Sequence, residues 1–285
     1  HFRPFAVSDT EGAEGLFTGY YEPELRGSRT RSAEYATPLY GRPGDLVIVD
    51  LGRFRPGLAG DRIAGRVENG QLVPYPSRGD IVRGGLEGRA TPLLYVDNGI
   101  DAFFLHIQGS GRVLLNDGTM VRVGYEAQNG HPYVAIGRVL IDAGELTKDG
   151  VSMQSIRAWL TEHPDRAEEV MDTNPSYVFF KELPLGDPAL GPVGAQGVEL
   201  TDEASLAVDR RHHALGLPFW LDGFAPAEGG GDRKYQRLLI AQDTGGAIRG
   251  VVRGDVFWGH GDGPADIAGR MQHRGEFYVL LPKAV

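Results

Sequence analysis

Short runs of aromatic and β-branched residues punctuated by turn residues dominate the first third of the chain. Residues 16–24, Leu-Phe-Thr-Gly-Tyr-Tyr-Glu-Pro-Glu, end at a proline, and residues 46–50 form a second apolar run. Residues 93–96 form a third run of the same kind. Short apolar segments bounded by Gly and Pro are typical of β-strands. The opening of the chain is therefore predicted to be rich in strands.

Residues 102–108 show a two-residue alternation in which Phe103, Leu105 and Ile107 share one side. This period predicts a strand that ends at Gly109. After it, two further apolar runs flank Asn116-Asp117-Gly118, a turn sequence that strongly favours a β-hairpin. Residues 102–123 are therefore predicted to be strands throughout.

The period changes to that of a helix in residues 131–173. Tyr133, Ile136, Leu140 and Ala143 recur at helical spacing. Ser152 is a suitable cap for a second helix through Trp159, Pro164 can begin a third, and Asn174-Pro175 ends the helical region. From Tyr177 onward the pattern is that of short strands again, including 177–180, 205–208, 237–241 and 277–281. We therefore expect a mainly β chain with an α-containing insertion.

Composition and charge narrow the class of protein. The 285 residues are 41% hydrophobic and 24% charged, which is typical of a folded globular chain. The net charge of −9 and the lack of a long basic run argue against nucleic-acid binding. No cysteine is present, which excludes disulfides, thiolate catalysis and cysteine metal sites. The chain begins at His1 without Met, so we expect a mature or trimmed form.

Three aspartates near the C-terminus form the densest group of candidate catalytic residues. Asp243 follows an apolar strand and precedes Thr-Gly-Gly, and Asp255 and Asp266 follow it at similar intervals. A carboxylate beside glycines at a strand end allows a bulky ligand to approach closely. By residue type alone, however, a turn cap is the favoured interpretation of Asp243, because this is the commoner role.

Other candidate sites carry weaker signals. His212, His213, His260 and His273 are not spaced as metal ligands and are expected to be surface or hydrogen-bonded histidines. The turn Gln108-Gly109-Ser110-Gly111 lacks the full frame of a nucleophilic serine elbow, so a polar turn is the better interpretation. Neither a metal nor a cofactor is expected.

Several segments, taken in order, resemble one family, the membrane-bound lytic transglycosylase A family. The C-terminal aspartates resemble its three-aspartate (3D) domain, and the resemblance covers nearly the whole chain. The matching segments are Phe17–Pro23, Pro76–Arg78, Phe103–Gly111, Gly130–Tyr133, Ile136–Asp142, Asn174–Phe180, Ala207–Arg210 and the set Asp243, Asp255 and Asp266. Each motif alone is weak, but their shared order is specific, and it favours a catalytic Asp243 over a turn cap.

The resemblance implies a two-domain fold. Residues 1–74 and 175–285 would form a double-psi β-barrel domain that carries the catalytic aspartate. Residues 75–174 would form a smaller inserted α/β domain, and a groove between the domains would hold the glycan. These expectations agree with the β-rich pattern and its helical middle section.

The resemblance also implies an activity on peptidoglycan. The family cleaves the β-1,4 bond between N-acetylmuramic acid (MurNAc) and N-acetylglucosamine (GlcNAc) and leaves a 1,6-anhydro end. Asp243 would be the general acid and then the general base, with Asp255 and Asp266 in support. The residues implied to bind substrate, from the matched motifs and the loop after Asp243, are Tyr20, Tyr21, Ser77, Arg78, Gln108, Gly109, Ser110, Tyr133, Gly245 and Gly246.

Two alternatives remain at this point. A lysozyme-like hydrolase would use Asp243 as the acid and a second aspartate as the base, and a glycan-binding module would have no catalytic acid at all. We expect a monomer that binds glycan strands, with further partners in the cell-wall machinery. The resemblance implies a periplasmic location, with an outer-membrane anchor in the native precursor, because this chain lacks the anchoring cysteine.

Overall fold

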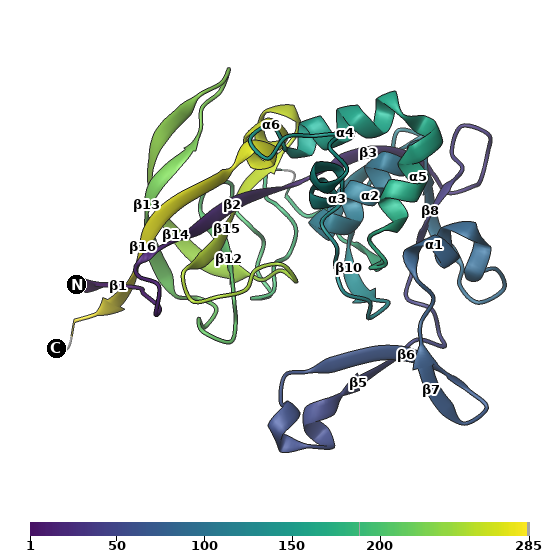
Figure 1. Cartoon of the computed structure of the whole chain (residues 1–285), viewed down its shortest axis with the longest axis horizontal. Coiled ribbons are helices and arrows are strands. Elements are labelled where there is room, and N and C mark those ends of the chain that lie inside the picture. The colour runs from purple at the N-terminus through teal and green to yellow at the C-terminus, as the bar shows by residue number, and fades with distance from the viewer. Residues whose placement is uncertain (188, 284–285) are drawn as a thin grey trace. The chain divides into compact units, whose positions relative to one another are not determined.

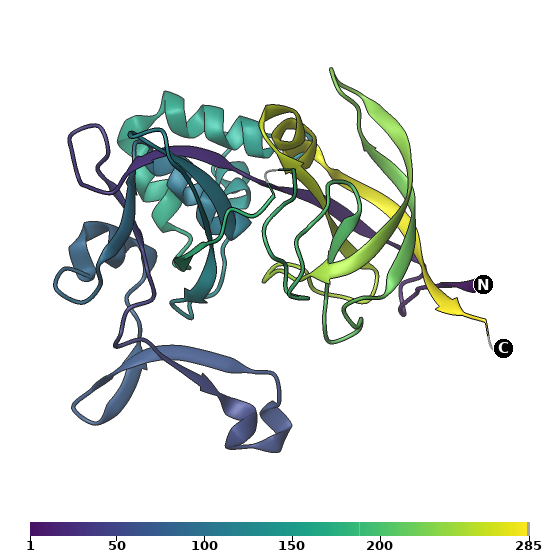
Figure 2. The same ribbon diagram turned by 180° about the vertical axis from the view of Figure 1, so that it is seen from behind.

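The chain folds into two compact units in a computed structural model that describes residues 1–187 and 189–283. Unit 1 combines both ends of the chain, His1–Glu24 and Leu185–Val285, whereas unit 2 is the continuous segment Leu25–Pro184. Figures 1 and 2 show the strands of unit 1 in purple, green and yellow, because they come from the two ends of the sequence. Within the described residues, no helix is both long and apolar enough to span a membrane.

Unit 1 is a closed barrel of six strands. Its elements are β1 (Phe2–Ala6), β2 (Glu14–Glu22), β12 (Ser205–Val208), β13 (Pro218–Pro226), β14 (Asp232–Asp243), β15 (Arg253–His260), α6 (Asp262–Arg270) and β16 (Gln272–Pro282). The hydrogen-bonded order is β16-β13-β14-β12-β15-β2, and a further β16–β2 pairing closes the ring. Strand β1 adds to the outside of β16. Because β2 is parallel to β15 and β12 to β14, the barrel mixes both directions, and the predicted barrel fold is confirmed.

The barrel follows from a two-residue alternation of burial along its strands. In β13, Phe219 and Leu221 are buried whereas Trp220 between them is 38% exposed. The ring of Phe277 from β16 stacks on that of Phe219 at 4.8 Å and meets Phe17 of β2 edge-on at 5.3 Å. These three rings therefore join strands from both ends of the sequence in one core.

Unit 2 is built on a six-stranded sheet in the order β11-β10-β9-β3-β8-β4. Its strands are β3 (Glu24–Ser28), β4 (Thr37–Tyr40), β5 (Val47–Asp50), β6 (Arg62–Glu68), β7 (Gln71–Pro74), β8 (Pro92–Val96), β9 (Ser110–Leu115), β10 (Met120–Gln128) and β11 (Val178–Leu183). Its helices are η1 (Leu51–Arg53), η2 (Pro56–Leu58), α1 (Arg78–Asp80), η3 (Ile81–Gly85), α2 (Gly99–Gln108), α3 (Ile136–Asp142), α4 (Met153–Glu162) and α5 (Pro164–Asp172). Strands β5, β6 and β7 form a separate three-stranded sheet, called here the arm, which Figure 1 shows projecting from the rest of unit 2.

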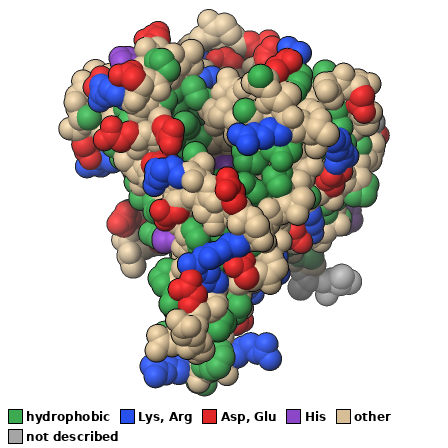
Figure 3. Space-filling view, turned by 90° about the vertical axis from the view of Figure 1, so that its right-hand side faces the viewer, with side chains coloured by type: hydrophobic (Ala, Val, Ile, Leu, Met, Phe, Trp, Pro, Cys, Tyr) green, Lys and Arg blue, Asp and Glu red, His purple; other side chains and the backbone are tan. Residues whose placement is uncertain are grey.

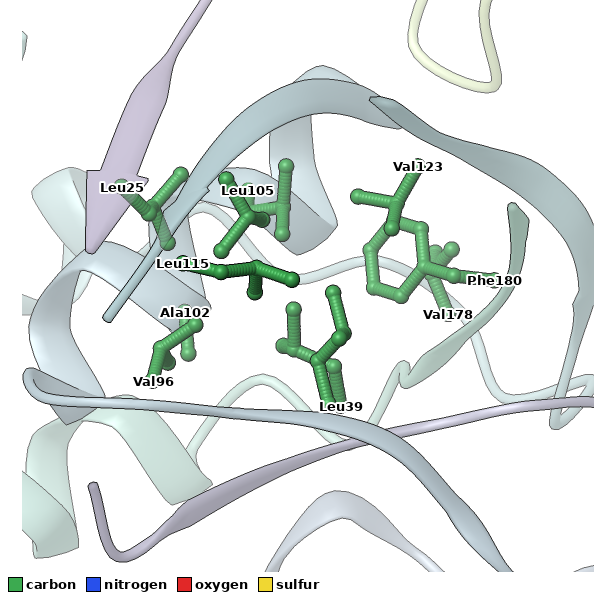
Figure 4. Close-up of a cluster of buried hydrophobic side chains, with 11 residues drawn as sticks. Leu25, Leu39, Val96, Ala102, Leu105, Leu115, Val123, Val178 and Phe180 are labelled. Carbon is green, nitrogen blue, oxygen red and sulfur yellow. The ribbon is translucent and has the colours of Figure 1, made fainter. Parts of the chain in front are cut away.

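Two apolar clusters hold unit 2 together. Leu39, Val123 and Phe180 belong to a cluster of aliphatic and aromatic side chains under the six-stranded sheet, and each is fully buried (Figure 4). Phe104 and Trp159 belong to a second cluster, between the helices. The predicted helices in residues 131–173 are present as α3, α4 and α5, and Ser152 caps α4 as expected through a bond from the Ser155 N–H.

The prediction of a strand at 102–108 is wrong, because these residues lie in helix α2. Asn98 accepts hydrogen bonds from the N–H groups of Ile100 and Asp101 and so caps the helix, and Gly109 ends it with a left-handed φ of 83°. A short apolar run fits a buried helix as well as a strand, and in α2 the consecutive residues Phe103, Phe104 and Leu105 are all buried. The predicted hairpin at Asn116–Gly118 is present between β9 and β10.

The boundaries of the units differ from the predicted 74/75 and 174/175. Strands β3 and β4 pair with β8, so the segment before residue 75 belongs to the sheet of unit 2. Strand β11 pairs with β10, which extends unit 2 beyond residue 174. Unit 2 is therefore longer than the predicted insertion, and it is the larger of the two units rather than the smaller.

Candidate active site

Asp243 and Asp255 lie in one row of residues across four neighbouring barrel strands. The row runs from Thr18 on β2 to Asp255 on β15, Ala207 on β12 and Asp243 on β14. A bulge in the β12–β14 pairing places Asp243, rather than Gln242, opposite Ala207. Adjacent strands are about 4.8 Å apart, so the Cα atoms of the two aspartates lie roughly 10 Å apart. The barrel thus brings together two carboxylates twelve positions apart in the sequence.

The carboxylate of Asp243 is held by donors on both of its oxygens. The Ala195 N–H donates to Oδ1 at 3.0 Å, and the Tyr20 hydroxyl donates to Oδ2 at 2.9 Å. Burial raises the pKa of Asp243 above the ordinary value, against hydrogen bonds from the Thr244 and Ala195 backbone and from Tyr20. These donors favour the ionised form of Asp243 and oppose the larger effect of burial.

Asp255 is held by fewer donors. The Thr18 hydroxyl donates to its Oδ1 at 2.6 Å, whereas Oδ2 accepts no hydrogen bond from the described residues. Burial raises the pKa of Asp255, and the negative charge of Asp243 raises it further, whereas Arg253 and the Thr18 hydroxyl act in the opposite direction. Asp255 therefore combines a raised pKa with an oxygen open to a proton or a substrate atom.

Tyr20 is the side-chain donor to Asp243. Its ring packs against that of Phe257 with centroids 5.2 Å apart, and its hydroxyl donates to Asp243. Burial raises the pKa of Tyr20 well above the ordinary value, and the charges of Asp243 and Asp255 add to this effect. The phenol therefore stays protonated and acts as a hydrogen-bond donor.

Tyr20→Phe is expected to lower kcat/KM for glycan cleavage by about tenfold, because a hydrogen bond to a charged group contributes about 1.5–3 kcal/mol. The ring and its packing on Phe257 would remain. Steady-state kinetics on isolated glycan strands would measure the loss. Tyr278→Phe is the matched control, since its hydroxyl donates only to the exposed Glu276. Equal activity of the two variants would contradict a role for the Tyr20 hydroxyl.

The third predicted aspartate is not part of this pair. Asp266 lies on α6, where Arg270 of the same helix donates to it at 2.5 Å, and its side chain is 48% exposed. This bond to Arg270 holds the pKa of Asp266 below the ordinary value. A carboxylate held ionised near the surface is unsuited to proton donation, so Asp266 has the properties of a helix-surface ion pair.

The remaining candidates in unit 1 occupy different environments. Tyr21 is buried in β2 with 6% exposure, so its ring belongs to the interior of the unit. Gly245 and Gly246 follow Asp243 directly, and a side chain at Gly245 would approach Ile248 to 3.0 Å, whereas Gly246 has open space around it. Thr18, Ala195 and Arg253 also contact or influence the pair, and no motif pointed to the last two.

The candidates of unit 2 gather around a buried arginine. Arg78 is 3% exposed, and it contacts Nδ1 of His106 at 3.0 Å and donates to the Ser176 carbonyl at 2.8 Å. Its guanidinium lies over the rings of Phe103 and Tyr177, at 4.7 and 5.3 Å from their centroids. Burial lowers the pKa of Arg78 to about 10, which leaves it charged at neutral pH. These contacts indicate that Arg78 supports the fold of unit 2.

Arg78→Met is expected to lower the free energy of unfolding by about 1–3 kcal/mol, because the Ser176 carbonyl and His106 lose a buried donor. Denaturant unfolding would measure the change. Arg83→Met is the matched control, since Arg83 is 59% exposed and its ion pair with Asp172 is on the surface. If Arg78→Met left stability unchanged and raised only KM, Arg78 would be a binding residue instead.

The other unit 2 candidates lie at accessible positions. Ser77 caps α1 and lines a surface cavity of about 670 Å³ that Asp80 and His131 also line. Tyr133 is 47% exposed. Gln108, Gly109 and Ser110 connect α2 to β9, so this segment is a helix end followed by a strand and not a serine elbow.

Histidines and carboxylates do not gather as metal ligands in residues 1–187 and 189–283, where no group of three is found. His213 contacts the Val251 carbonyl at 2.7 Å through Nε2, and His273 contacts Asp232 at 3.0 Å. These two histidines are hydrogen-bonded side chains, as expected.

Comparison with known proteins identifies the family. The family model for the MltA specific insert domain matches residues 16–181, and that for the 3D domain matches residues 204–281. Membrane-bound lytic murein transglycosylase A of Escherichia coli K12 is 34% identical over 98% of this chain and 71% of that protein. The chain belongs to the MltA family. The resemblance seen in the sequence is thereby confirmed, as is the enzyme class of lytic murein transglycosylase.

Solved structures of MltA proteins share the fold. The membrane-bound lytic murein transglycosylase of Agrobacterium tumefaciens is 37% identical, with a TM-score of 0.86 over 99% of this chain and 76% of that one. E. coli MltA with bound chitohexaose is 30% identical, with a TM-score of 0.81 over 99% of this chain and 76% of that one. The barrel and inserted unit of this chain are therefore those of the MltA fold.

Proposed function

We propose that this protein cleaves the β-1,4 bond between MurNAc and GlcNAc in peptidoglycan and leaves a 1,6-anhydroMurNAc end. Membership of the MltA family supports the substrate and the reaction class. The observation that carries the chemistry is the buried pair Asp243 and Asp255, with Tyr20 donating to one of them. The bound chitohexaose of the E. coli relative supports the binding of a β-linked amino-sugar strand.

One proton-carrying carboxylate is sufficient for this reaction. Ordinary glycosidases use a second carboxylate as the nucleophile or to activate water. Here the C6 hydroxyl of the MurNAc residue attacks its own anomeric carbon, and an intramolecular attack has a very large effective molarity. The acid donates a proton to the glycosidic oxygen as its bond to the anomeric carbon breaks. The resulting carboxylate then takes the proton of the C6 hydroxyl as the new C–O bond forms, so the acid is regenerated.

The hydrogen-bond donors around the two aspartates favour Asp255 as the proton carrier. The resemblance seen in the sequence assigned this role to Asp243. Both oxygens of Asp243 already accept hydrogen bonds, whereas Oδ2 of Asp255 is open to the substrate. Burial, and to a smaller extent the negative charge of Asp243, raise the pKa of Asp255, which favours a protonated acid at working pH. In this proposal Asp243 is a positioning residue that keeps Asp255 protonated and Tyr20 oriented.

The product mass from isolated glycan strands tests the reaction. A transglycosylase leaves products that lack one water relative to hydrolysis, so anhydro ends without reducing MurNAc ends are expected. Reducing ends alone would instead establish a lysozyme-like hydrolase that uses both carboxylates. Tight glycan binding without any product would establish a binding module.

We also propose a periplasmic location for the enzyme, facing the cell wall. The name of the E. coli relative, which calls it membrane-bound, supports attachment of the native precursor to a membrane. Fractionation of cells that express the full-length precursor tests this, with recovery in the cytoplasm as the contrary result.

A further inference from the structure

The arm of unit 2 presents an open apolar face. Register places Val49 beside Ile63 and Val67 beside Leu72, with Val47 in the same row, so these side chains point to one side of the sheet. Val47, Ile63, Val67 and Leu72 are 37–61% exposed. Aliphatic side chains on one face of a small sheet normally pack against a second layer. On the arm this face lies open.

The opposite face of the arm contacts the rest of unit 2 at Ala64, whereas Ile48 beside it on the same face is 40% exposed. Ala64 lies on that side and packs against the cluster around Tyr75 and Phe179. The arm therefore packs on the core of the unit through Ala64, on the face opposite to Val47, Ile63, Val67 and Leu72. Figure 3 shows hydrophobic side chains together with basic and acidic ones on the narrow projection at the bottom of that view, where the arm lies.

The free end of the arm adds an exposed aromatic ring and positive charge. The segment between β5 and β6 carries Phe54, which is 75% exposed, between Arg53 and Arg55. These two arginines form no ion pair with another described residue, and neither does Arg62. Residues 47–74 carry four arginines and three carboxylates, whereas the whole chain has a net charge of −9. The arm thus has a net charge of +1 on an acidic protein, and two of its arginines flank the exposed Phe54.

We propose that the arm binds an anionic lipid surface. An apolar face with a terminal phenylalanine can enter the boundary between headgroups and acyl chains, while arginines beside it contact lipid phosphates. A lipid surface needs no matching shape, and the exposed side chains of this face are aliphatic. The same arginines on both copies disfavour pairing of two arms face to face, whereas an anionic lipid surface complements Arg53 and Arg55 beside Phe54.

Binding to vesicles tests the proposal independently of the catalytic assignment. The purified protein is mixed with vesicles of phosphatidylcholine alone or of phosphatidylcholine with phosphatidylglycerol, and the bound fraction is measured by sedimentation at low and high salt. Stronger binding to the anionic vesicles, weakened by salt, is expected. No binding to anionic vesicles at low salt would overturn the proposal.

Two variants of the arm separate its apolar and basic contributions. Phe54→Ser with Val67→Ser is expected to weaken binding by more than about tenfold, because two exposed apolar side chains no longer enter the lipid. Arg53→Gln with Arg55→Gln is expected to weaken it by roughly fivefold for each arginine. Phe224→Ser, at a 50% exposed position of unit 1, is the control and should bind like the unchanged protein.

Two outcomes would contradict the proposal even if vesicles bind. Equal loss of binding in Phe224→Ser and the arm variants would show that lipid contact is not specific to the arm. A concentration-dependent dimer in analytical ultracentrifugation that the arm variants abolish would show that a second copy covers the face. Cleavage of soluble glycan strands should be unchanged in all of these variants, so loss of activity would belong to the active-site proposal alone.

Discussion

Asp255→Asn is expected to reduce glycan cleavage by about 10²- to 10⁴-fold, the usual contribution of a general acid. The amide keeps the acceptor for the Thr18 hydroxyl but carries no transferable proton. Product release from isolated glycan strands, quantified by mass spectrometry, gives the rate. Binding of the strands should be retained, because the side chain keeps its shape.

Matched substitutions at the other two aspartates make the assignment specific. Asp243→Asn is expected to lower cleavage less than Asp255→Asn and to shift the pH profile to lower pH, since the negative charge that raises the pKa of Asp255 is removed. Asp266→Asn should retain most activity, because its partner is Arg270 on the helix surface. An inactive Asp243→Asn beside an active Asp255→Asn would instead make Asp243 the acid.

Asp255→Asn is expected to raise the stability of the protein although it lowers its activity. Burial raises the pKa of Asp255 in the folded state above its unfolded value. Its contribution to stability is therefore fully present below the unfolded pKa and is lost as pH rises through the folded pKa. At neutral pH Asp255→Asn is expected to unfold at a higher denaturant concentration than the unchanged protein. A variant that is inactive but more stable cannot owe its inactivity to misfolding.

Phe180→Ala is expected to lower the free energy of unfolding by about 3–5 kcal/mol, as is usual for a large-to-small change in a core. Phe180 is fully buried among Leu39, Val123 and neighbouring side chains of unit 2, as Figure 4 shows. Its ring also stacks on that of His106 at 5.4 Å. Truncation would leave a cavity at the centre of the sheet and remove support from the His106–Arg78 contact.

Denaturant unfolding followed by circular dichroism measures this loss. Phe54→Ala is the matched control within the same unit, because Phe54 is 75% exposed and should change stability little. Equal effects of the two substitutions would mean that the cluster around Phe180 does not govern the stability of unit 2.

Local patterns predicted much of the fold, and they failed where distant pairing decides the outcome. Ser152 and Asn116–Gly118 carry their signals within a few residues, so the helix start and the hairpin were predicted correctly. Residues 102–108 fit a strand and a helix equally well by period, and the cap at Asn98 decided for the helix. The unit boundaries depend on which strands pair with β8, and no local pattern contains that information.

The candidate site was also predicted only in part. The resemblance pointed to Asp243, Asp255 and Tyr20, which the barrel brings together. It could not separate Asp266 from them, because the ion pair with Arg270 depends on a helix that the strand pattern did not predict. Nor could it distinguish the roles of Asp243 and Asp255. The roles proposed for them rest on a bulge beside Ala207 and on the Ala195 N–H, and each is a contact between segments far apart in the sequence.

The barrel of unit 1 closes where β2, from the start of the chain, pairs with β16, from its end. The hydrogen bonds that orient the two carboxylates also join the start of the chain to its end, since Thr18 and Tyr20 bind partners 237 and 223 positions later. During synthesis, unit 2 is complete while these partners are still missing, and it can fold from contacts that lie closer in sequence. Hence a ribosome-bound or truncated chain would hold a folded insertion beside an unassembled catalytic pair. Wall-cleaving activity would begin only when the last strand is in place.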